Sequence, residues 1–175
     1  MEPFSIKPYI TEKQLEEKIK EIGDQLTQKL QGRKVVAVCV LKGSFMFYSD
    51  LIRQMDLDLT CEFFGVSSYQ GTSSSGEVKV TLDLAHPIEN QHVILVEDIV
   101  DTGITMNYLK NALLSRKPAS LTTVALLSKP EALKVPCQLD YVGFKISNEF
   151  VVGYGLDYDG YYRNLPFIGQ VQSFQ

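Results

Sequence analysis

Residues 93–105 read VILVEDIVDTGIT, in which four aliphatic residues lead into adjacent carboxylates and then into a small polar loop. A strand that is apolar at every position is typical of a parallel sheet covered on both faces. Apolar residues at helical spacing, beginning with Met106 and Leu109, follow the loop, so we expect a helix to begin near Thr105. The stretch predicts a buried strand, a tight loop and a helix, which is the repeating unit of an α/β domain.

The rest of the chain repeats this alternation. Thr11 and Gln14 have the form of a capping box, which predicts a first helix that ends near the glycine at 32, and a second helix is expected over 45–55. Residues 77–84 alternate in polarity, as in a strand with one solvated face. The predicted strands lie at 34–41, 59–66, 77–84, 92–97, 121–127, 141–146 and 150–152. This order predicts a mostly parallel twisted sheet flanked by helices, in a single domain over 1–175.

The overall composition excludes several classes of protein. The formal net charge is −4 and the sequence pI is near 5.2, which argues against a nucleic-acid-binding surface. No apolar run approaches the roughly 18 residues of a membrane span, and the N-terminus lacks the features of a secretory signal. Cys39, Cys61 and Cys137 are odd in number and form no C-x-x-C pair, and two of them lie in apolar runs, which indicates buried, reduced thiols. We therefore expect a cytoplasmic protein without membrane or nucleic-acid partners.

Two of the predicted strands end in chemically distinctive turns. Lys42, Gly43 and Ser44 follow one strand, and residues 97–105 follow another. Ligands of open parallel sheets bind outside the carboxyl ends of the strands, and free amides at a helix start can bind phosphate without a lysine. Adjacent Glu97 and Asp98 suit a pair of sugar hydroxyls or a magnesium ion, since carboxylates only accept hydrogen bonds. The alternative is that these acids are solvated and that Asp101 only caps the helix.

The motif ED-x-x-DTG at 97–103 resembles the phosphoribosyl-pyrophosphate (PRPP) binding motif of the type I phosphoribosyltransferases. Further matches at 40–44 (VLKGS), 67–69 (SSY), 126–130 (LLSKP) and 141–158 make the chain similar to the hypoxanthine (hypoxanthine-guanine) branch of that family. The resemblance implies the family's fold, with a small hood built mainly from the C-terminal segment. It also implies a purine salvage reaction, in which phosphoribose moves from PRPP to hypoxanthine, and also to guanine, giving IMP or GMP and pyrophosphate.

The resemblance further implies roles for individual residues. Glu97 and Asp98 would bind the ribose hydroxyls beside Mg²⁺, with Asp157 as a further metal ligand. Asp101 would be the catalytic base that accepts the proton of the purine. The remaining PRPP- or nucleotide-binding residues would be Leu41, Lys42, Gly43, Ser44, Ser68, Tyr69, Thr102, Gly103, Ile104, Thr105 and Arg163, often with a cis peptide before the lysine. The purine would be bound by Lys129, Phe150, Val151, Leu156 and Asp157.

The polar loop at 67–77 would close over the pyrophosphate as a lid, although an ordinary mobile hairpin tip has the same composition. Relatives of this kind assemble as homodimers or homotetramers, often through the first strand-helix unit. A competing hypothesis on the same fold is a nucleotide-sensing regulator that binds RNA, which the net charge of −4 disfavours.

Overall fold

The computed structural model describes residues 4–68 and 78–173, and its centre is a six-stranded sheet in the order β4-β3-β2-β5-β6-β7. All pairs are parallel except the edge pair of β3 and β4. The strands are β2 (Val35–Leu41), β3 (Leu59–Ser68), β4 (Val78–Leu82), β5 (His92–Val100), β6 (Ser120–Ser128) and β7 (Tyr141–Lys145). The prediction of a mostly parallel α/β sheet is therefore confirmed.

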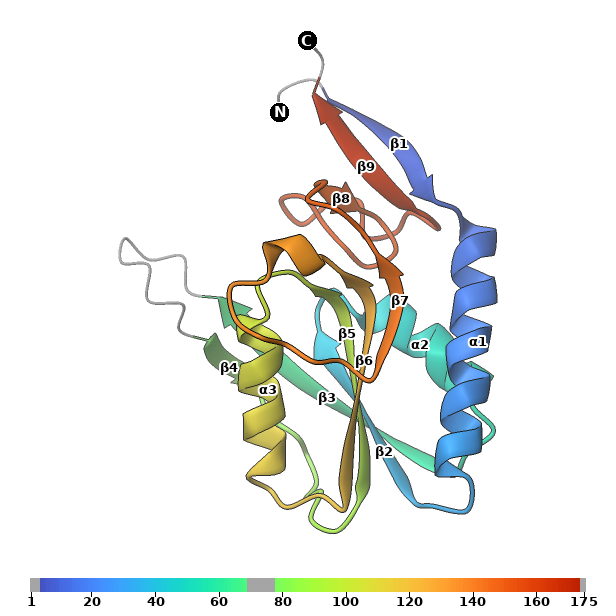
Figure 1. Ribbon diagram of the computed structural model, residues 1–175, viewed down its shortest axis with the longest axis vertical. Coiled ribbons are helices and arrows are strands. Elements are labelled where there is room, and N and C mark those ends of the chain that lie inside the picture. Colours follow the sequence, from blue (N-terminus) through green and yellow to red (C-terminus); the bar gives the residue numbers. More distant parts are fainter. Residues whose placement is uncertain (1–3, 69–77, 174–175) are drawn as a thin grey trace.

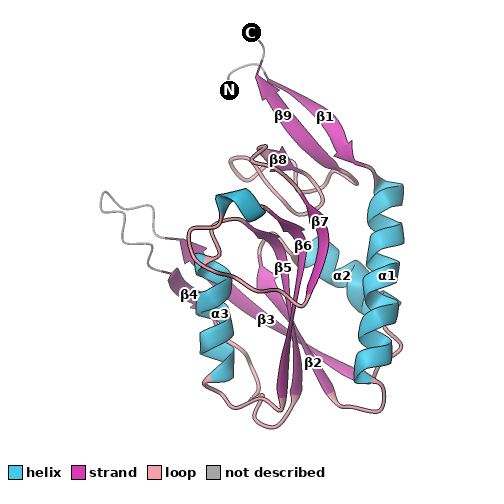
Figure 2. Ribbon diagram, in the orientation of Figure 1, coloured by secondary structure: helices cyan, strands magenta, loops and turns pink. Residues whose placement is uncertain are grey.

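Helices cover both faces of this sheet. Figures 1 and 2 show α1 (Glu12–Leu30) and α2 (Phe45–Gln54) on one side and α3 (Ile104–Leu114) on the other. Alternate residues of β2 enter two separate cores, since Ala37 packs on the α1–α2 side and Val38 on the α3 side. The capping box at Thr11 and Gln14 is present, so the predicted start of the first helix is confirmed.

The order of the strands places a ligand crevice between β2 and β5. The chain leaves β2 toward β3 on one side and leaves β5 toward β6 on the other, although β2 and β5 are neighbours. Loops that follow the two strands therefore diverge at this point, which opens a crevice at the carboxyl ends of the strands. The two distinctive turns of the sequence both lie at this position.

A second, three-stranded antiparallel sheet forms a hood above the carboxyl edge of the main sheet (Figure 1). Its order is β1-β9-β8, with β1 (Phe4–Ile10), β8 (Val151–Val152) and β9 (Ile168–Ser173). The sequence indicated neither β1 nor β9, because β1 contains Pro8 and β9 has few apolar residues. Proline is tolerated in β1 because this strand lies at the edge of its sheet, and the register shifts next to Pro8.

Other expectations need correction at the β3–β4 edge of the main sheet. Ser67 and Ser68 belong to β3 and pair with Lys79 and Val78, so the strand extends further than predicted, and residues 69–77 lie outside the described part of the chain. Strand β4 does not have one buried face, since four of its five residues are exposed. Cys61 is also exposed rather than buried.

A short 3-10 helix, η1 (Pro130–Ala132), follows β6. Within the described residues, no helix combines the length and the apolar character required to cross a bilayer.

Candidate active site

The turns after β2 and β5 meet in one crevice of about 340 Å³. Residues far apart in the sequence line it, because the parallel strands bring their carboxyl ends to the same edge. The lining residues are Val40, Leu41, Lys42, Gly43, Val66, Glu97, Asp98, Thr105, Asp157 and Arg163. The structure thus brings together in this crevice half of the residues that the resemblance assigns to PRPP.

The turn after β2 lies directly against Asp98. A Cβ atom on Gly43 would lie 1.4 Å from Asp98 Oδ2, so only glycine fits at this position. The peptide bond between Leu41 and Lys42 is cis. Ser44 differs from the expectation, because its side chain is buried and its hydroxyl donates to the carbonyl of Val40 at 2.5 Å. Ser44 is fully buried and does not line the crevice.

The loop between β5 and α3 (residues 101–103), called the anion loop below, has a geometry that would suit an anion. Gly103, the N-cap of α3, has a φ of +81°, which favours glycine, and it offers no side chain to the first-turn amides. The hydroxyl of Thr102 accepts from the amide of Ile104 at 3.4 Å. The first-turn amides of a helix lack intrahelical partners and carry its positive dipole end. Beside them lies a cavity of about 90 Å³, lined by Glu97, Ile99, Val100, Asp101, Thr102, Gly103, Thr105 and Met106. The carbonyl of Thr102 accepts from the amide of Lys134 at 3.0 Å, which fixes the loop from behind.

Glu97 and Asp98 are desolvated acids at the end of β5. Glu97 is 8% exposed and its Oε2 has no hydrogen-bond partner. Burial, and secondarily the neighbouring Asp98, raise the pKa of Glu97 well above its usual value. Burial also raises the pKa of Asp98 to about 6, although the amide of Ile99 and the charge of Arg163 oppose the change. A ligand that supplies hydroxyl donors or positive charge would relieve both acids.

Glu97 and Asp98 fit a magnesium ion only if the ion takes most of its ligands from water and from the substrate. No group of three or more His, Cys, Asp or Glu side chains suited to a metal occurs among the described residues. Magnesium typically keeps several waters and uses one or two carboxylates together with substrate phosphates. Glu97, with its unpartnered oxygen, and Asp98 meet that requirement. Asp157 is already engaged, since its oxygens accept from Arg163 at 2.6 Å and from the amide of Gly160 at 2.8 Å.

Asp101, in the anion loop, lies beside Lys129, which follows β6. Lys129 Nζ lies 3.9 Å from Asp101 Oδ2. The side chain of Asp101 is 51% exposed, whereas that of Lys129 is only 11% exposed. The lysine amide donates to the carbonyl of Val100 at 2.9 Å, which fixes the end of β6 beside the end of β5. An acid and a cation are therefore available side by side to one ligand.

The hood supplies an exposed aromatic ring. Phe150 is 50% exposed, and its ring meets that of Tyr158 edge to face, with centroids 5.7 Å apart. Val151, the next residue in the chain, is buried. Leu156 packs its side chain into the core and is not brought to the crevice. Sequence reasoning missed Tyr158, for which the density of aromatic residues at 158–162 was the available signal.

The remaining predicted residues divide between the crevice and the β3 edge. Arg163 lines the crevice, where Nη1 donates to the carbonyl of Gly155 at 2.5 Å. Ile104 begins α3, and Thr105 lines both cavities. Ser68 ends β3, and Tyr69 lies outside the described residues, so a closing lid stays a prediction.

A crevice at the β2–β5 junction, with an amide-lined anion loop and adjacent acids, defines a phosphoribosyl transferase. The chain belongs to that family, because the family model described as "Phosphoribosyl transferase domain" matches residues 9–159.

Among its relatives, a hypoxanthine-guanine phosphoribosyltransferase of Staphylococcus aureus is 49% identical over 164 residues, which cover 93% of this chain and 92% of that protein. A crystal structure of such an enzyme from Bacillus anthracis superposes with a TM-score of 0.91 at 45% identity, covering 96% of this chain and 100% of that one. A hypoxanthine phosphoribosyltransferase of Trypanosoma cruzi, in complex with its product IMP, has a TM-score of 0.89 at 45% identity and covers 95% of this chain and 94% of that one.

Proposed function

We propose that this protein transfers phosphoribose from PRPP to hypoxanthine, and also to guanine, forming IMP or GMP and releasing pyrophosphate. The observation that carries the proposal is the crevice that joins the anion loop of α3 to Glu97 and Asp98. The names of the relatives support the same reaction. None of these named relatives is an RNA-binding regulator, so that hypothesis has no support among them.

The chain's own residues would bind the two ends of PRPP. The amides and hydroxyls of residues 101–105 would bind the 5′-phosphate, and Glu97 and Asp98 would accept from the ribose hydroxyls. The turn at 41–44 and Arg163 would bind the pyrophosphate. Magnesium, when bound, would offset charge on the departing pyrophosphate. It would be held by Glu97 and Asp98, and Asp157, whose oxygens already accept from Arg163 and from the amide of Gly160, could contribute through its remaining lone pairs.

The purine would lie between the hood and the anion loop. Phe150 would stack on the base, the backbone of Val151 would meet its edge, and Lys129 would donate to its exocyclic oxygen. The half-exposed carboxylate of Asp101 would accept the proton of the attacking imidazole nitrogen. When the purine is bound, Lys129 would interact both with the carboxylate of Asp101 and with the exocyclic oxygen of the purine.

The direct test is turnover of the purified protein with PRPP, Mg²⁺ and one purine at a time. We expect IMP from hypoxanthine and GMP from guanine, with adenine a poor substrate, because Lys129 donates to an oxygen and adenine carries an amino group there. Absence of turnover with every purine would refute the proposed reaction.

A variant of Asp101 tests the proposed role of this residue as the catalytic base. Asp101→Asn should lower kcat by about 10²–10⁴-fold while KM for PRPP changes little. Near-normal turnover in this variant would show that Asp101 is not the base.

We also propose that the protein is a cytoplasmic homo-oligomer, a dimer or a tetramer, with the hood and the main sheet acting as one domain. Phe45, Phe63 and Leu82 are 37%, 43% and 46% exposed. A contiguous patch of such groups would suit a protein interface. Free cysteines agree with a reducing compartment. Sedimentation of the wild type and of Phe63→Ser would test the assembly, because loss of this ring should shift the equilibrium toward the monomer.

A further inference from the structure

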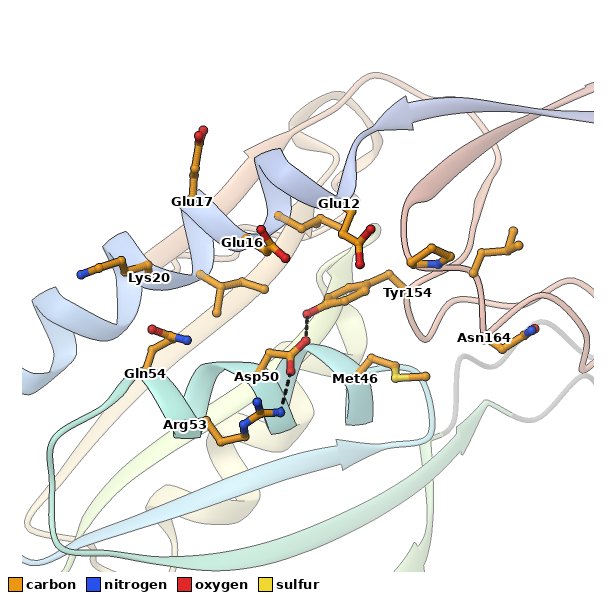
Figure 3. Close-up of a pocket in the computed structure, with 14 residues that line it drawn as sticks. Glu12, Glu16, Glu17, Lys20, Met46, Asp50, Arg53, Gln54, Tyr154 and Asn164 are labelled. Atoms are coloured by element: carbon orange, nitrogen blue, oxygen red, sulfur yellow. Dashed lines mark hydrogen bonds and ion pairs between the residues drawn. The ribbon is translucent and has the colours of Figure 1, made fainter.

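A hydrogen bond joins the hood to α2 at some distance from the substrates. The hydroxyl of Tyr154 donates to Asp50 Oδ2 at 2.5 Å, and Arg53 Nη1 lies 3.4 Å from Asp50 Oδ1 (Figure 3). Both partners line a cavity of about 620 Å³ between α1, α2 and the hood, which shares no lining residue with the crevice. The bond is therefore available to no ligand of the crevice, and its role has to be sought in what it holds in place.

The backbone at Tyr154 is unusual for a residue with a side chain. Its φ is +48°, between Gly153 at +98° and Gly155 at +100°. A bulky residue in this left-handed region costs free energy and persists only where its surroundings require it. Burial, followed by the bond to Asp50, raises the pKa of the Tyr154 hydroxyl, so it remains a donor. The side chain therefore compensates for an unfavourable backbone that a third glycine would adopt without strain.

The turn that Tyr154 anchors presses on the pyrophosphate turn. A Cβ atom on Gly155 would lie 2.0 Å from the carbonyl oxygen of Gly43. Gly43 in turn lies against Asp98, as described above. Three layers are thus stacked without space between them: the acid of β5, the turn after β2, and the hood turn. A displacement of the hood turn must move Gly43 or open a gap beside it.

The same turn fixes Arg163. The guanidinium donates to the carbonyl of Gly155 at 2.5 Å, and the amide of Gly155 donates to the carbonyl of Arg163 at 2.9 Å. The amide of Tyr154 donates to the carbonyl of Leu165, also at 2.9 Å. Both groups proposed for the pyrophosphate, the turn at 41–44 and Arg163, therefore depend on the position of residues 154 and 155.

We propose that Tyr154 and Asp50 are positioning residues for the pyrophosphate end of the site, acting through Gly43 and Arg163. The proposal rests on the proposed function. The pair touches neither substrate; it holds the hood turn at the distance from α2 at which Gly155 packs against Gly43. Lys129, at the base end of the site, makes no contact with this turn in the described hydrogen bonds and ion pairs, whereas Val151 and Leu156 adjoin the turn along the chain. The larger effect should therefore fall on PRPP, whose proposed contacts at Gly43 and Arg163 touch the turn directly.

The test compares Tyr154→Phe, Asp50→Ala, Asp50→Asn and the double variant Tyr154→Phe/Asp50→Ala in steady-state kinetics. We expect Tyr154→Phe and Asp50→Ala each to raise KM for PRPP about tenfold, while KM for hypoxanthine stays within about twofold. Asp50→Asn retains an acceptor oxygen and should restore near-normal KM. The double variant should be no worse than either single variant, because one bond is lost in each case. Tyr161→Phe, which removes a hydroxyl from a residue that is 58% exposed in the same hood, is the matched control and should resemble the wild type.

Hydrogen exchange of the free protein distinguishes this proposal from the proposed reaction. Tyr154→Phe should speed exchange at the amide of Gly155 and at that of Phe45, which donates to the carbonyl of Lys42 at 3.3 Å. If the wild type turned over no purine, the reaction would be refuted, and the exchange data would still decide whether the pair holds the turn. Unchanged exchange at both amides, or equal increases in KM for both substrates, would overturn the positioning role.

Discussion

Asp98 should lower the stability of the empty protein, and replacing it with asparagine should raise that stability. Burial raises the pKa of Asp98 from 3.8 to about 6, so its ionised form is disfavoured in the folded state. At about 1.4 kcal/mol for each pKa unit, the ionised carboxylate costs at most about 3 kcal/mol of unfolding free energy at neutral pH. Asparagine keeps an oxygen that can accept the amide of Ile99, which now lies 2.6 Å from Asp98 Oδ1. The gain should be accompanied by loss of activity, since the acid is proposed to bind the ribose.

The pH dependence of the unfolding free energy shows whether Asp98 stabilises or destabilises the folded protein. Between about pH 4 and pH 6 the unfolded chain has lost the proton of Asp98 while the folded protein retains it, so the wild type loses stability as the pH rises. The contribution of the protonated acid is complete below about pH 3.8 and is lost as the pH rises through about 6. Glu97 should add an effect of the same sign, because burial and, secondarily, the charge of Asp98 raise its pKa as well. Asp98→Asn and the wild type should therefore converge toward pH 4 and diverge up to pH 7.5.

Urea unfolding followed by far-ultraviolet circular dichroism is the appropriate assay, because the chain has no tryptophan. Asp159→Asn is a matched control, since this acid is exposed and its φ of +52° suits asparagine. A surface change of this kind should alter stability by no more than about 0.5 kcal/mol. Equal stability of Asp98→Asn and the wild type at pH 7.5, or parallel pH profiles, would refute the reasoning.

Three further predictions concern other parts of the site. Gly103→Ala should destabilise the protein by about 1–3 kcal/mol in the same urea assay and weaken PRPP binding, because φ is +81° and the new Cβ would lie 2.9 Å from that of Cys137. Lys129→Gln should lower kcat/KM for hypoxanthine by about 10–100-fold with little change in KM for PRPP, since a charged donor to the base is lost; a larger effect on PRPP would contradict its role at the purine. Removal of divalent ions with a chelator should stop turnover and leave the circular dichroism spectrum unchanged, and added Mg²⁺ should restore activity; turnover in excess chelator would exclude the metal.

Local patterns in the sequence were sufficient for the buried central strands of the main sheet. Each buried strand of a parallel sheet must be apolar on both faces, so 34–41 and 92–97 could be recognised without knowledge of their partners. The capping box at Thr11 and Gln14 and the glycine before α3 are also local, because their hydrogen bonds and backbone angles involve only near neighbours. The tight turn between β5 and α3 was predictable for the same reason.

The hood, and the contacts that hold the site residues in place, could not be predicted from the sequence because they depend on tertiary structure. Strand β1 pairs with β9 from the opposite end of the chain, so neither could be recognised from its own residues. The burial of the Ser44 hydroxyl, the pairing of Asp157 with Arg163 and the bond from Tyr154 to Asp50 likewise join groups whose contacts depend on packing. The sequence by itself determined the residue types at the crevice and the strands that carry them. Only the folded chain decided which of those side chains remain open to a ligand, because each polar group turns to a protein partner wherever packing brings one within reach.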